Sequence, residues 1–274
     1  MLLVFAALTW AEGELPGRFV INSDGDVVCF SQGNLVYTKS SKTWSFAEHQ
    51  YDVIGTENIT SDGTALANQI DLFGWSADGM DGTYPSALHY GVSTSTSSQD
   101  YIGNFRDWGN NKITNGGDNL YAGWRTLTAD EWSYLIANNT PFPTSVNNVK
   151  GIAIIPKDSE LDDMPTEYTL EQWALAEQKG VIFLPFTGWR EELTVSDLDT
   201  YGYYWTATAR DTENSKVVRC NSSKAAVRSS GSELDRTRGH AVRLVKAASS
   251  CVVTISAEPN TPYGGSVEID VLDE

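Results

Sequence analysis

The sequence predicts an α+β fold made of small sheets, two helices and long irregular loops. Short aromatic-rich segments are separated by Gly, Asn, Asp and Ser, and only two stretches have the pattern of a helix. With 274 residues, the chain fits one large domain, or one domain and a fragment, and can bury roughly 70–75% of its unfolded surface. A sizeable core is therefore expected.

Both expected helices begin with a capping box. Thr128 is followed three residues later by Glu131, and Thr169 by Gln172. Trp132 and its apolar neighbours fall on one face of the first helix. Gly180 is placed to end the second.

Strands are expected where β-branched and aromatic residues cluster. The expected strands are 18–22, 27–31, 34–38, 151–156, 180–186, 202–209 and 240–246. Residues 94–119 are rich in Gly, Asn and Ser, and we expect an ordered, irregular loop there that Tyr101, Phe105 and Trp108 hold in place.

Residues 201–245, which we call the display block, have two strand-like ends around a long stretch of small, polar and basic residues. So polar a stretch stays ordered only if its neighbours hold it, and ordered polar surface on a rigid framework commonly binds ligands. The alternative interpretation is a plain solvated loop.

The net charge of −17 disfavours nucleic acid and anionic lipid as partners. The charge is uneven, because residues 190–246 hold ten basic and eight acidic residues. This segment is therefore the part of the chain that repels an anionic ligand least. The effect is local, because physiological salt screens charges beyond ~8 Å.

The termini suggest an exported protein, secreted or at the cell surface. Residues 1–16 include an apolar run that resembles the hydrophobic part of a secretory signal, with an ordinary strand as the alternative. The run is about half of the ~20 apolar residues that span a bilayer, so no membrane insertion is expected. Residues 17–246 form the expected main domain, and 247–274 a linker with a β-hairpin or the start of another β domain.

The sequence contains no recognisable catalytic or metal motif, and a non-enzymatic protein is expected. Paired carboxylates are predicted to be solvated, and the histidines are far apart; these are Asp130–Glu131, Asp162–Asp163, Glu191–Glu192, His49, His89 and His240. Cys29, Cys220 and Cys251 are too scattered for a disulfide framework.

No cofactor is expected, with calcium as the alternative. Oxygen ligands near glycines occur at 24–28, 78–84 and 115–119, although turn chemistry explains them without a metal. The tripeptide "EPN" at 258–260 matches one found in calcium-dependent lectins, but it lies in the tail and no "WND" accompanies it.

Several segments together resemble a family of exported Bacteroidota-type proteins with a C-type lectin-like fold. They include "FSQGNLVYTKSSKTWSFAEHQYDVIG", "IDLFGWSADG", "GWRTLTADEWSYLI", "GVIFLPFTGWR", "GYYWTATA" and "RGHAVRLVK". The resemblance spans about 17–246 and extends to the Fibrobacter major paralogous domain. It implies a small twisted antiparallel sheet flanked by two helices, with long loops over one face.

The same resemblance reaches formylglycine-generating enzymes, more distantly. Those enzymes use a copper-binding cysteine pair late in the domain, where this chain has only Cys220. The resemblance therefore does not imply that activity.

The display block also resembles the variable region of proteins diversified by retroelements. Such regions lie between a "YYW" strand and an "SVRLV" strand, and here "GYYWTATA" and "GHAVRLV" match, with Ala241 in place of Ser. Residues 209–238 are rich in the types that rewritten Asn codons produce. Lys216, Lys224, Glu213 and Glu233 do not arise in that way.

These observations predict a non-catalytic display or adhesion protein. Its partner is expected to be a protein or carbohydrate on another cell or on a phage or host surface. An enzyme on a related scaffold and a structural surface subunit are the alternatives. The expected ligand-binding residues, with Tyr204 and Trp205 as framework or edge, are Tyr204, Trp205, Arg210, Asp211, Arg219, Asn221, Lys224, Arg228, Asp235, Arg236 and Arg238.

Overall fold

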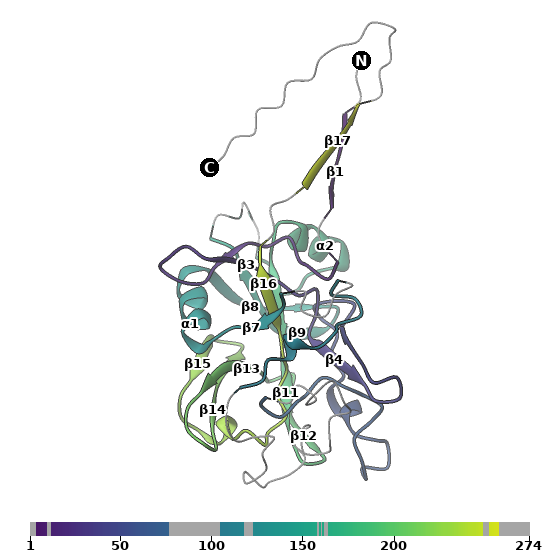
Figure 1. Ribbon diagram of the computed structural model, residues 1–274, viewed down its shortest axis with the longest axis vertical. Coiled ribbons are helices and arrows are strands. Elements are labelled where there is room, and N and C mark those ends of the chain that lie inside the picture. Colours follow the sequence, from purple (N-terminus) through teal and green to yellow (C-terminus); the bar gives the residue numbers. More distant parts are fainter. Residues whose placement is uncertain are drawn as a thin grey trace, which may run out of the picture. The chain divides into compact units, whose positions relative to one another are not determined.

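A computed structural model describes the backbone of residues 4–9, 12–76, 105–117, 123–157, 159, 161, 164–248 and 252–257. It divides the chain into two compact units (Figure 1). Residues 1–11 and 249–274 form the first, and residues 12–248 form the second, which we call the main unit. The architecture is α+β, as the sequence predicts, with small and mostly antiparallel sheets and two helices in the described ranges.

The described residues of the first unit form one strand pair. Strand β1 (Val4–Thr9) runs antiparallel to β17 (Val252–Ala257). The N-terminal apolar run is therefore a strand here, which was the alternative interpretation. The rest of the expected hairpin, including the "EPN" tripeptide at 258–260, lies outside the described residues.

The boundary expected at residue 16 is corrected to residue 11. Residues 12–16 belong to the main unit, where the side chain of Leu15 packs in a core cluster with 5% exposure. At the other end the main unit extends to 248, close to the expected 246.

The described residues of the main unit form four small sheets. The first has the order β10-β9-β8, and its strands are β8 (Thr140–Val146), β9 (Val149–Ile155) and β10 (Ile182–Pro185). The second has the order β5-β4-β6, with β4 (Leu35–Thr38), β5 (Thr43–Phe46) and β6 (Gln69–Ile70). The third has the order β2-β3-β16-β7, with β2 (Phe19–Val20), β3 (Val27–Phe30), β7 (Arg125–Thr126) and β16 (Leu244–Ala247).

The fourth sheet carries most of the display block. Its order is β12-β11-β13-β14-β15, with β11 (Thr187–Glu191), β12 (Thr194–Leu198), β13 (Tyr201–Ala209), β14 (Ser215–Asn221) and β15 (Ala225–Arg228). The pairs are antiparallel except β11 with β13, which is parallel and contains the pair Gly188 and Gly202.

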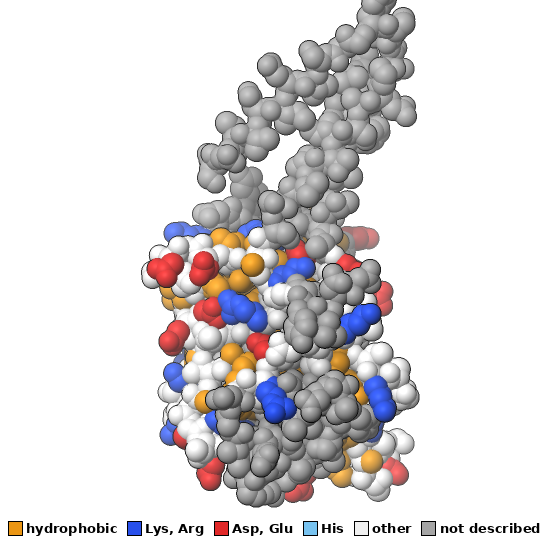
Figure 2. Space-filling view, in the orientation of Figure 1, with side chains coloured by type: hydrophobic (Ala, Val, Ile, Leu, Met, Phe, Trp, Pro, Cys, Tyr) orange, Lys and Arg blue, Asp and Glu red, His pale blue; other side chains and the backbone are white. Residues whose placement is uncertain are grey.

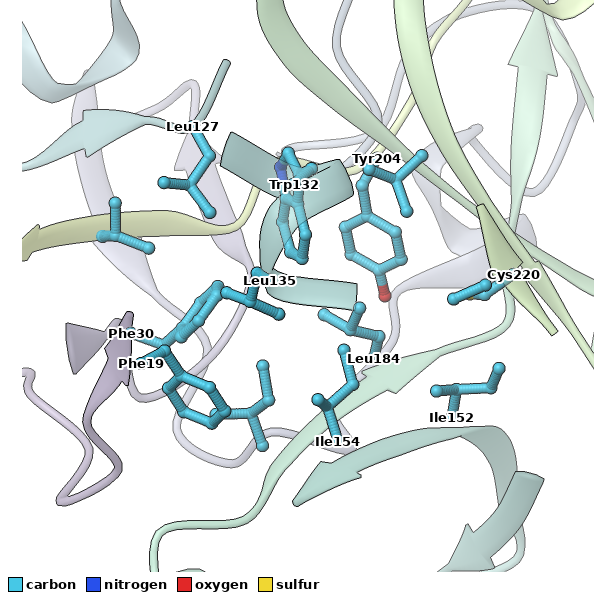
Figure 3. Close-up of a cluster of buried hydrophobic side chains, with 14 of the residues drawn as sticks. Phe19, Phe30, Leu127, Trp132, Leu135, Ile152, Ile154, Leu184, Tyr204 and Cys220 are labelled. Atoms are coloured by element: carbon cyan, nitrogen blue, oxygen red, sulfur yellow. The ribbon is translucent and has the colours of Figure 1, made fainter. Parts of the chain in front are cut away.

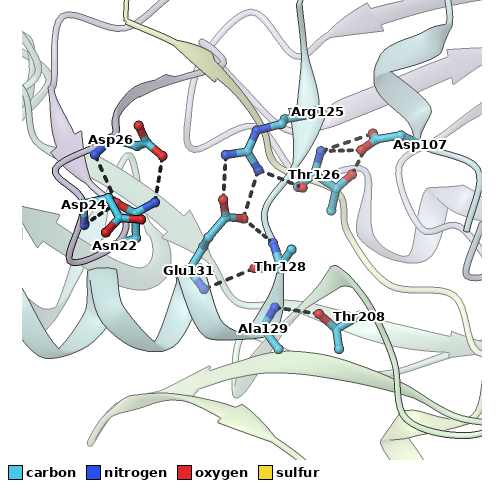
Figure 4. A network of polar contacts seen from close by, with 10 residues as sticks. All are labelled: Asn22, Asp24, Asp26, Asp107, Arg125, Thr126, Thr128, Ala129, Glu131 and Thr208. Carbon is cyan, nitrogen blue, oxygen red and sulfur yellow. Dashed lines mark hydrogen bonds and ion pairs between the residues drawn. The ribbon is translucent and has the colours of Figure 1, made fainter.

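The two helices begin at the predicted capping boxes. Helix α1 (Ala129–Asn138) follows Thr128, whose hydroxyl accepts from the Glu131 amide at 3.2 Å, while the Glu131 carboxylate accepts from the Thr128 amide at 2.7 Å (Figure 4). Helix α2 (Leu170–Gln178) has the same reciprocal pair between Thr169 and Gln172. Gly180 follows the end of α2 with a φ of +88°. Glycine is favoured at this position because it adopts the left-handed conformation without strain.

Three hydrophobic clusters form the core, and two of them meet the sheet of the display block. Helix α1 packs against β13, β14 and β15 and contributes Trp132 and Leu135 to the first cluster (Figure 3). The second cluster is rich in aromatic residues, including Trp205. The third joins α2 to β9 and β10. The fourth sheet is thus held from both faces.

The display block differs from expectation in having regular structure inside it. The expected polar stretch contains β14, β15 and the short 3-10 helix η4 (Ser232–Leu234). Val217, Val218 and Cys220 on β14 are fully buried, so this stretch is neither free of apolar anchors nor a plain loop. The last expected strand, 240–246, is shorter than predicted, because His240 and Ala241 make only isolated bridges before β16 begins.

The loop expected at 94–119 is described only in part. Trp108 is fully buried and Phe105 packs on it with ring centroids 5.5 Å apart, as expected of anchoring residues. Tyr101 lies outside the described residues.

Candidate functional site

The structure separates the expected ligand-binding residues by exposure. Arg210, Asp211 and Lys224 are exposed, and three others are buried. The half-buried ones are Arg219, Asn221, Arg228, Asp235 and Arg238. Each group has a different role.

Tyr204 and Trp205 are framework residues and are not accessible to a ligand. The Tyr204 hydroxyl donates to the Pro185 carbonyl at 2.8 Å, and the Trp205 indole donates to the Phe73 carbonyl at 2.7 Å. Both side chains are almost fully buried. Their polar atoms are satisfied inside the protein, so they fix the path of β13.

Arg236 corrects the prediction, because its side chain lies inside the protein. Its guanidinium carbon lies 4.2 Å from the centre of the Trp75 ring, and its N–H groups donate to the carbonyls of Asn214 and Asp211. The residue is 2% exposed, and this burial lowers the pKa of its guanidinium. Arg236 therefore ties the β13–β14 turn to the aromatic cluster.

Asp211, Asn221 and Asp235 shape turns. The Asp211 carboxylate accepts from the amides of Glu213 and Asn214 at 2.9 and 2.8 Å, and these hydrogen bonds, that of the Asn214 side chain first, lower its pKa. Asn221 accepts from the amide of Ser223 at 2.9 Å, and Asp235 accepts from the amide of Thr237 at 2.9 Å. Such side chains hold a loop conformation whatever the ligand.

The register of the sheet decides which side chains share a face. Tyr203 lies opposite Arg219, and Trp205 lies opposite Val217, which in turn lies opposite Arg228. Directly opposed residues point to the same side of a sheet. Trp205 and Val217 are covered by the second core cluster, whereas Arg219 and Arg228 reach solvent. One face of the sheet is therefore half core and half surface.

A continuous series of contacts crosses the sheet along the surface half and includes the buried Tyr203, which is 5% exposed. We call it the arginine–aromatic band, and it consists of Trp189, Asp197, Tyr201, Tyr203, Arg219, Arg228, Glu233 and Arg238. With strands spaced about 4.8 Å apart, a band that runs from β12 to β15 is about 19 Å wide. Of its members, only the three arginines were expected from the sequence.

Asp197 organises one end of the band. Its Oδ2 atom accepts from the Trp189 indole and from the Tyr203 hydroxyl, each at 3.0 Å. Burial, followed by the nearby Asp197 carboxylate, raises the pKa of Tyr203, so the hydroxyl stays protonated and donates. Arg238 stacks on Trp189 at 4.0 Å and pairs with Glu191 at 2.7 Å. The rings of Trp189 and Tyr203 are therefore fixed in orientation.

Glu233 organises the other end. Its Oε1 atom lies 3.3 Å from Arg219 and 3.1 Å from Arg228, so two guanidinium groups share one carboxylate oxygen. Arg219 also lies over the Tyr201 ring at 5.4 Å. The side chains of Arg219, Arg228 and Glu233 are 27%, 33% and 13% exposed. Water, and hence a ligand, reaches the arginines more easily than the carboxylate.

Three carboxylates outside the band are structural, and two of them, the buried Asp71 and the half-buried Asp107, were not expected from the sequence. Asp71 accepts from the Ile54 amide at 3.0 Å and from Asn58 at 2.7 Å, and burial raises its pKa. Asp107 accepts from the amides of Gly109 and Thr126, which joins a 3-10 turn to β7. Glu131, expected to be solvated, instead pairs with Arg125 at 2.7 Å (Figure 4). None of these three carboxylates contacts the band.

Titratable groups for nucleophilic or metal chemistry are not assembled in the described part of the chain. Burial raises the pKa of Cys29 and of Cys220 to about 12, and both thiols are enclosed. Over the described residues, no group of three His, Cys, Asp or Glu side chains could hold a metal ion. His89, Cys251, Asp162–Asp163 and the segment 78–84 lie outside the described residues.

A second candidate is a pocket of about 270 Å³ beside α2. Its lining is mostly apolar and comprises Leu161, Pro165, Tyr168, Gln172, Leu175, Ala176 and Lys179. Leu170 and Leu175 are also exposed on α2, by 51% and 62%. The pocket brings one cation and one amide to an apolar wall, whereas the band brings together several charged and aromatic groups.

Comparison of the chain with protein-family models, with curated proteins and with solved structures finds no significant match. No helix in the described ranges has the length and apolar character to cross a membrane. Figure 2 shows basic and acidic side chains interspersed on one face of the main unit.

Proposed function

We propose that the protein is a non-catalytic ligand-binding protein of the display or adhesion type, and that the arginine–aromatic band is its binding surface. The observation that carries the proposal is the two-sided anchoring of the fourth sheet. Buried residues such as Val218 and Trp205 hold the strands, while neighbouring Arg219 and Arg228 face solvent. Arginine, tyrosine and tryptophan are also the residue types that dominate binding energy in protein interfaces.

We also propose that the main unit has a C-type lectin-like arrangement and that the display block is diversified by a retroelement. The two capped helices and small antiparallel sheets support the first part. For the second, the support is that exposed positions alternate with buried anchors, so surface side chains can change without loss of the core. The proposed location is secreted or at the cell surface, and the partner a protein or carbohydrate.

Two alternatives have weaker support. An enzyme of the formylglycine-generating type would need a reactive cysteine pair, and burial keeps Cys220 protonated and enclosed. A structural surface subunit would use the strand pair of β1 and β17 to assemble with other chains. Light scattering of the full chain and of a chain lacking residues 249–274 would test that alternative.

The experiment compares two triple variants on glycan and cell-surface protein arrays. Arg219→Ala, Arg228→Ala and Arg238→Ala together remove three charges from the band. Lys112→Ala, Lys150→Ala and Lys157→Ala remove the same charge from exposed positions elsewhere. The first variant should bind more than tenfold more weakly, since hot-spot residues each contribute ~2 kcal/mol, and the second should bind like the wild type. Equal binding by both variants would contradict the proposal.

The diversification is tested separately by sequencing this locus across isolates. Differences should concentrate at 209–238, at positions whose side chains reach solvent, such as Arg219 and Arg228. Buried anchors such as Val218 and Leu234 should stay constant. An even spread of differences over the chain would rule the retroelement out.

A further inference from the structure

The shared carboxylate of Glu233 indicates what the band binds. We propose that the ligand is a protein that presents an acidic side chain, and that its carboxylate replaces Glu233 between Arg219 and Arg228. This inference rests on the proposed function, because it takes the band to be the binding surface. Glu233 then acts as an internal competitor that occupies the site until a partner arrives.

The two arginines have more donors than Glu233 uses. A guanidinium group carries five N–H donors in a planar fork that matches a carboxylate. Among the described contacts, Arg219 donates one hydrogen bond, to Glu233, and Arg228 donates two, to Glu233 and to the Ser230 carbonyl. The Glu233 interaction uses a single oxygen for both arginines. An incoming carboxylate with both oxygens available can engage more of these donors.

Glu233 can leave without disturbing the fold. Its carbonyl contacts the His240 Nε2 atom at 2.7 Å, and the next residue, Leu234, is fully buried, so the backbone of η4 is anchored. Among the described contacts, the Glu233 carboxylate is held only by Arg219 and Arg228. A change of rotamer is therefore sufficient to release both arginines.

Gly231 makes the internal pairing possible. Its φ of +127° is a backbone conformation that glycine adopts without strain. A Cβ atom built there would lie 2.1 Å from the Glu233 Oε2 atom. Any side chain at residue 231 would therefore displace the carboxylate. The chain next to it, Ser229 to Ser232, is exposed, so a displaced Glu233 side chain can turn into water.

The rings of the band favour a protein over a sugar. Carbohydrates stack on open aromatic faces, but Arg238 lies over the Trp189 ring and Arg219 over the Tyr201 ring. The band is also part of a sheet face about 19 Å wide, which suits the contact surface of a protein. Arginine and aromatic residues are the types enriched in protein interfaces.

The test measures binding of three probes to the full chain by NMR of the arginine Nε–H signals. The probes are acetyl-Glu-Glu-Glu-amide, its Gln counterpart and trigalacturonate. We expect the acidic peptide to shift the Arg219 and Arg228 signals and the Gln peptide to leave them in place. In E233Q the acidic peptide should bind about fivefold more tightly, as expected when a part-exposed competing carboxylate is removed.

E191Q is the matched control, because it removes the carboxylate of Glu191, which is 52% exposed and pairs with Arg238 of the band. If E191Q tightens binding as much as E233Q, the effect is one of general charge and the inference fails. If trigalacturonate binds as tightly as the acidic peptide, the ligand class is wrong. Thermal unfolding of both variants should match the wild type within a few degrees.

The two proposals fail in different ways. If the triple arginine variant loses its partner while no acidic peptide shifts the signals, the band binds ligands but the carboxylate inference is overturned. If the triple variant keeps its partner, the proposed function itself is overturned. If the peptide shifts Arg219 and Arg228 and E233Q tightens binding selectively, the inference is supported.

Discussion

The protein uses arginine in two ways, in its interior and on its display surface. Arg243 is fully buried and donates to the carbonyls of Ser31 at 3.0 Å and Phe183 at 2.7 Å. Arg190 likewise donates to the Leu72 and Glu192 carbonyls, each at 2.9 Å. On the surface, Arg219 and Arg228 pair with a carboxylate instead.

The difference teaches that the type of partner distinguishes an arginine fixed in the framework from one whose partner a ligand can replace. Backbone carbonyls fix an arginine as part of the framework, because nothing can replace them. A side-chain carboxylate is exchangeable for one from another molecule. By this criterion Arg236 is a framework residue like Arg243, because it donates to backbone carbonyls. From the sequence it was expected to bind a ligand, as Arg228 was.

The largest loss of folding stability should come from Arg243→Met. The substitution keeps the volume but leaves buried carbonyls of Ser31 and Phe183 without this donor, and each unsatisfied group costs ~1–3 kcal/mol. We expect the free energy of unfolding in urea to fall by about 3 kcal/mol or more. A loss below ~1 kcal/mol would show that water replaces the guanidinium and would break the comparison.

A smaller loss of stability is expected when the pH falls, and it should arise from His240. This residue lies beneath the fourth sheet, at the boundary between its buried and exposed halves. It stacks on Tyr203 and Trp205, and burial lowers its pKa from 6.5 to about 3. The unfolded chain therefore takes up this proton at a higher pH than the folded protein. The stability that results is complete above about pH 6.5 and is lost as pH falls toward 3.

Between pH 7 and pH 5 the loss due to His240 should be ~2 kcal/mol. Urea unfolding of His240→Gln at both pH values should show a change smaller by that amount than in the wild type. His49→Gln, at an exposed position, is the control and should retain the full dependence. If His240→Gln retains it too, the histidine is protonated in the folded protein.

Substitutions in the arginine–aromatic band should have the smallest effect on folding stability. Arg219→Met and Arg228→Met together should change the free energy of unfolding by less than about 1 kcal/mol, since part-exposed ion pairs contribute little. Binding of the acidic peptide should nevertheless be lost. A large loss of stability would place these arginines with Arg243 and remove the distinction.

The elements with local signals could be predicted from the sequence. Both capping boxes consist of residues three positions apart, and the main strands have clear apolar patterns, so neither needed tertiary information. The shortening of the last strand to Leu244–Ala247 could not be seen, because His240 and Ala241 are held by isolated bridges to Phe73 and Tyr204. Those partners are more than thirty positions away in the sequence.

The binding surface was predicted in its segment but not in its composition. Strand alternation could have separated Tyr201 and Tyr203 from Tyr204, since β13 sends them to opposite faces. Asp197 and Trp189 could not be found, because only the fold brings β11 and β12 to the edge of β13. Likewise, burial of Arg236 depends on Trp75, which is distant in sequence.

Strand β16, the last strand of the main unit, lies between β3 and β7. A ribosome must therefore release the whole display block before the third sheet can be completed. A nascent chain that stops within the block lacks this central strand, so β3 and β7 are left without the partner that joins them.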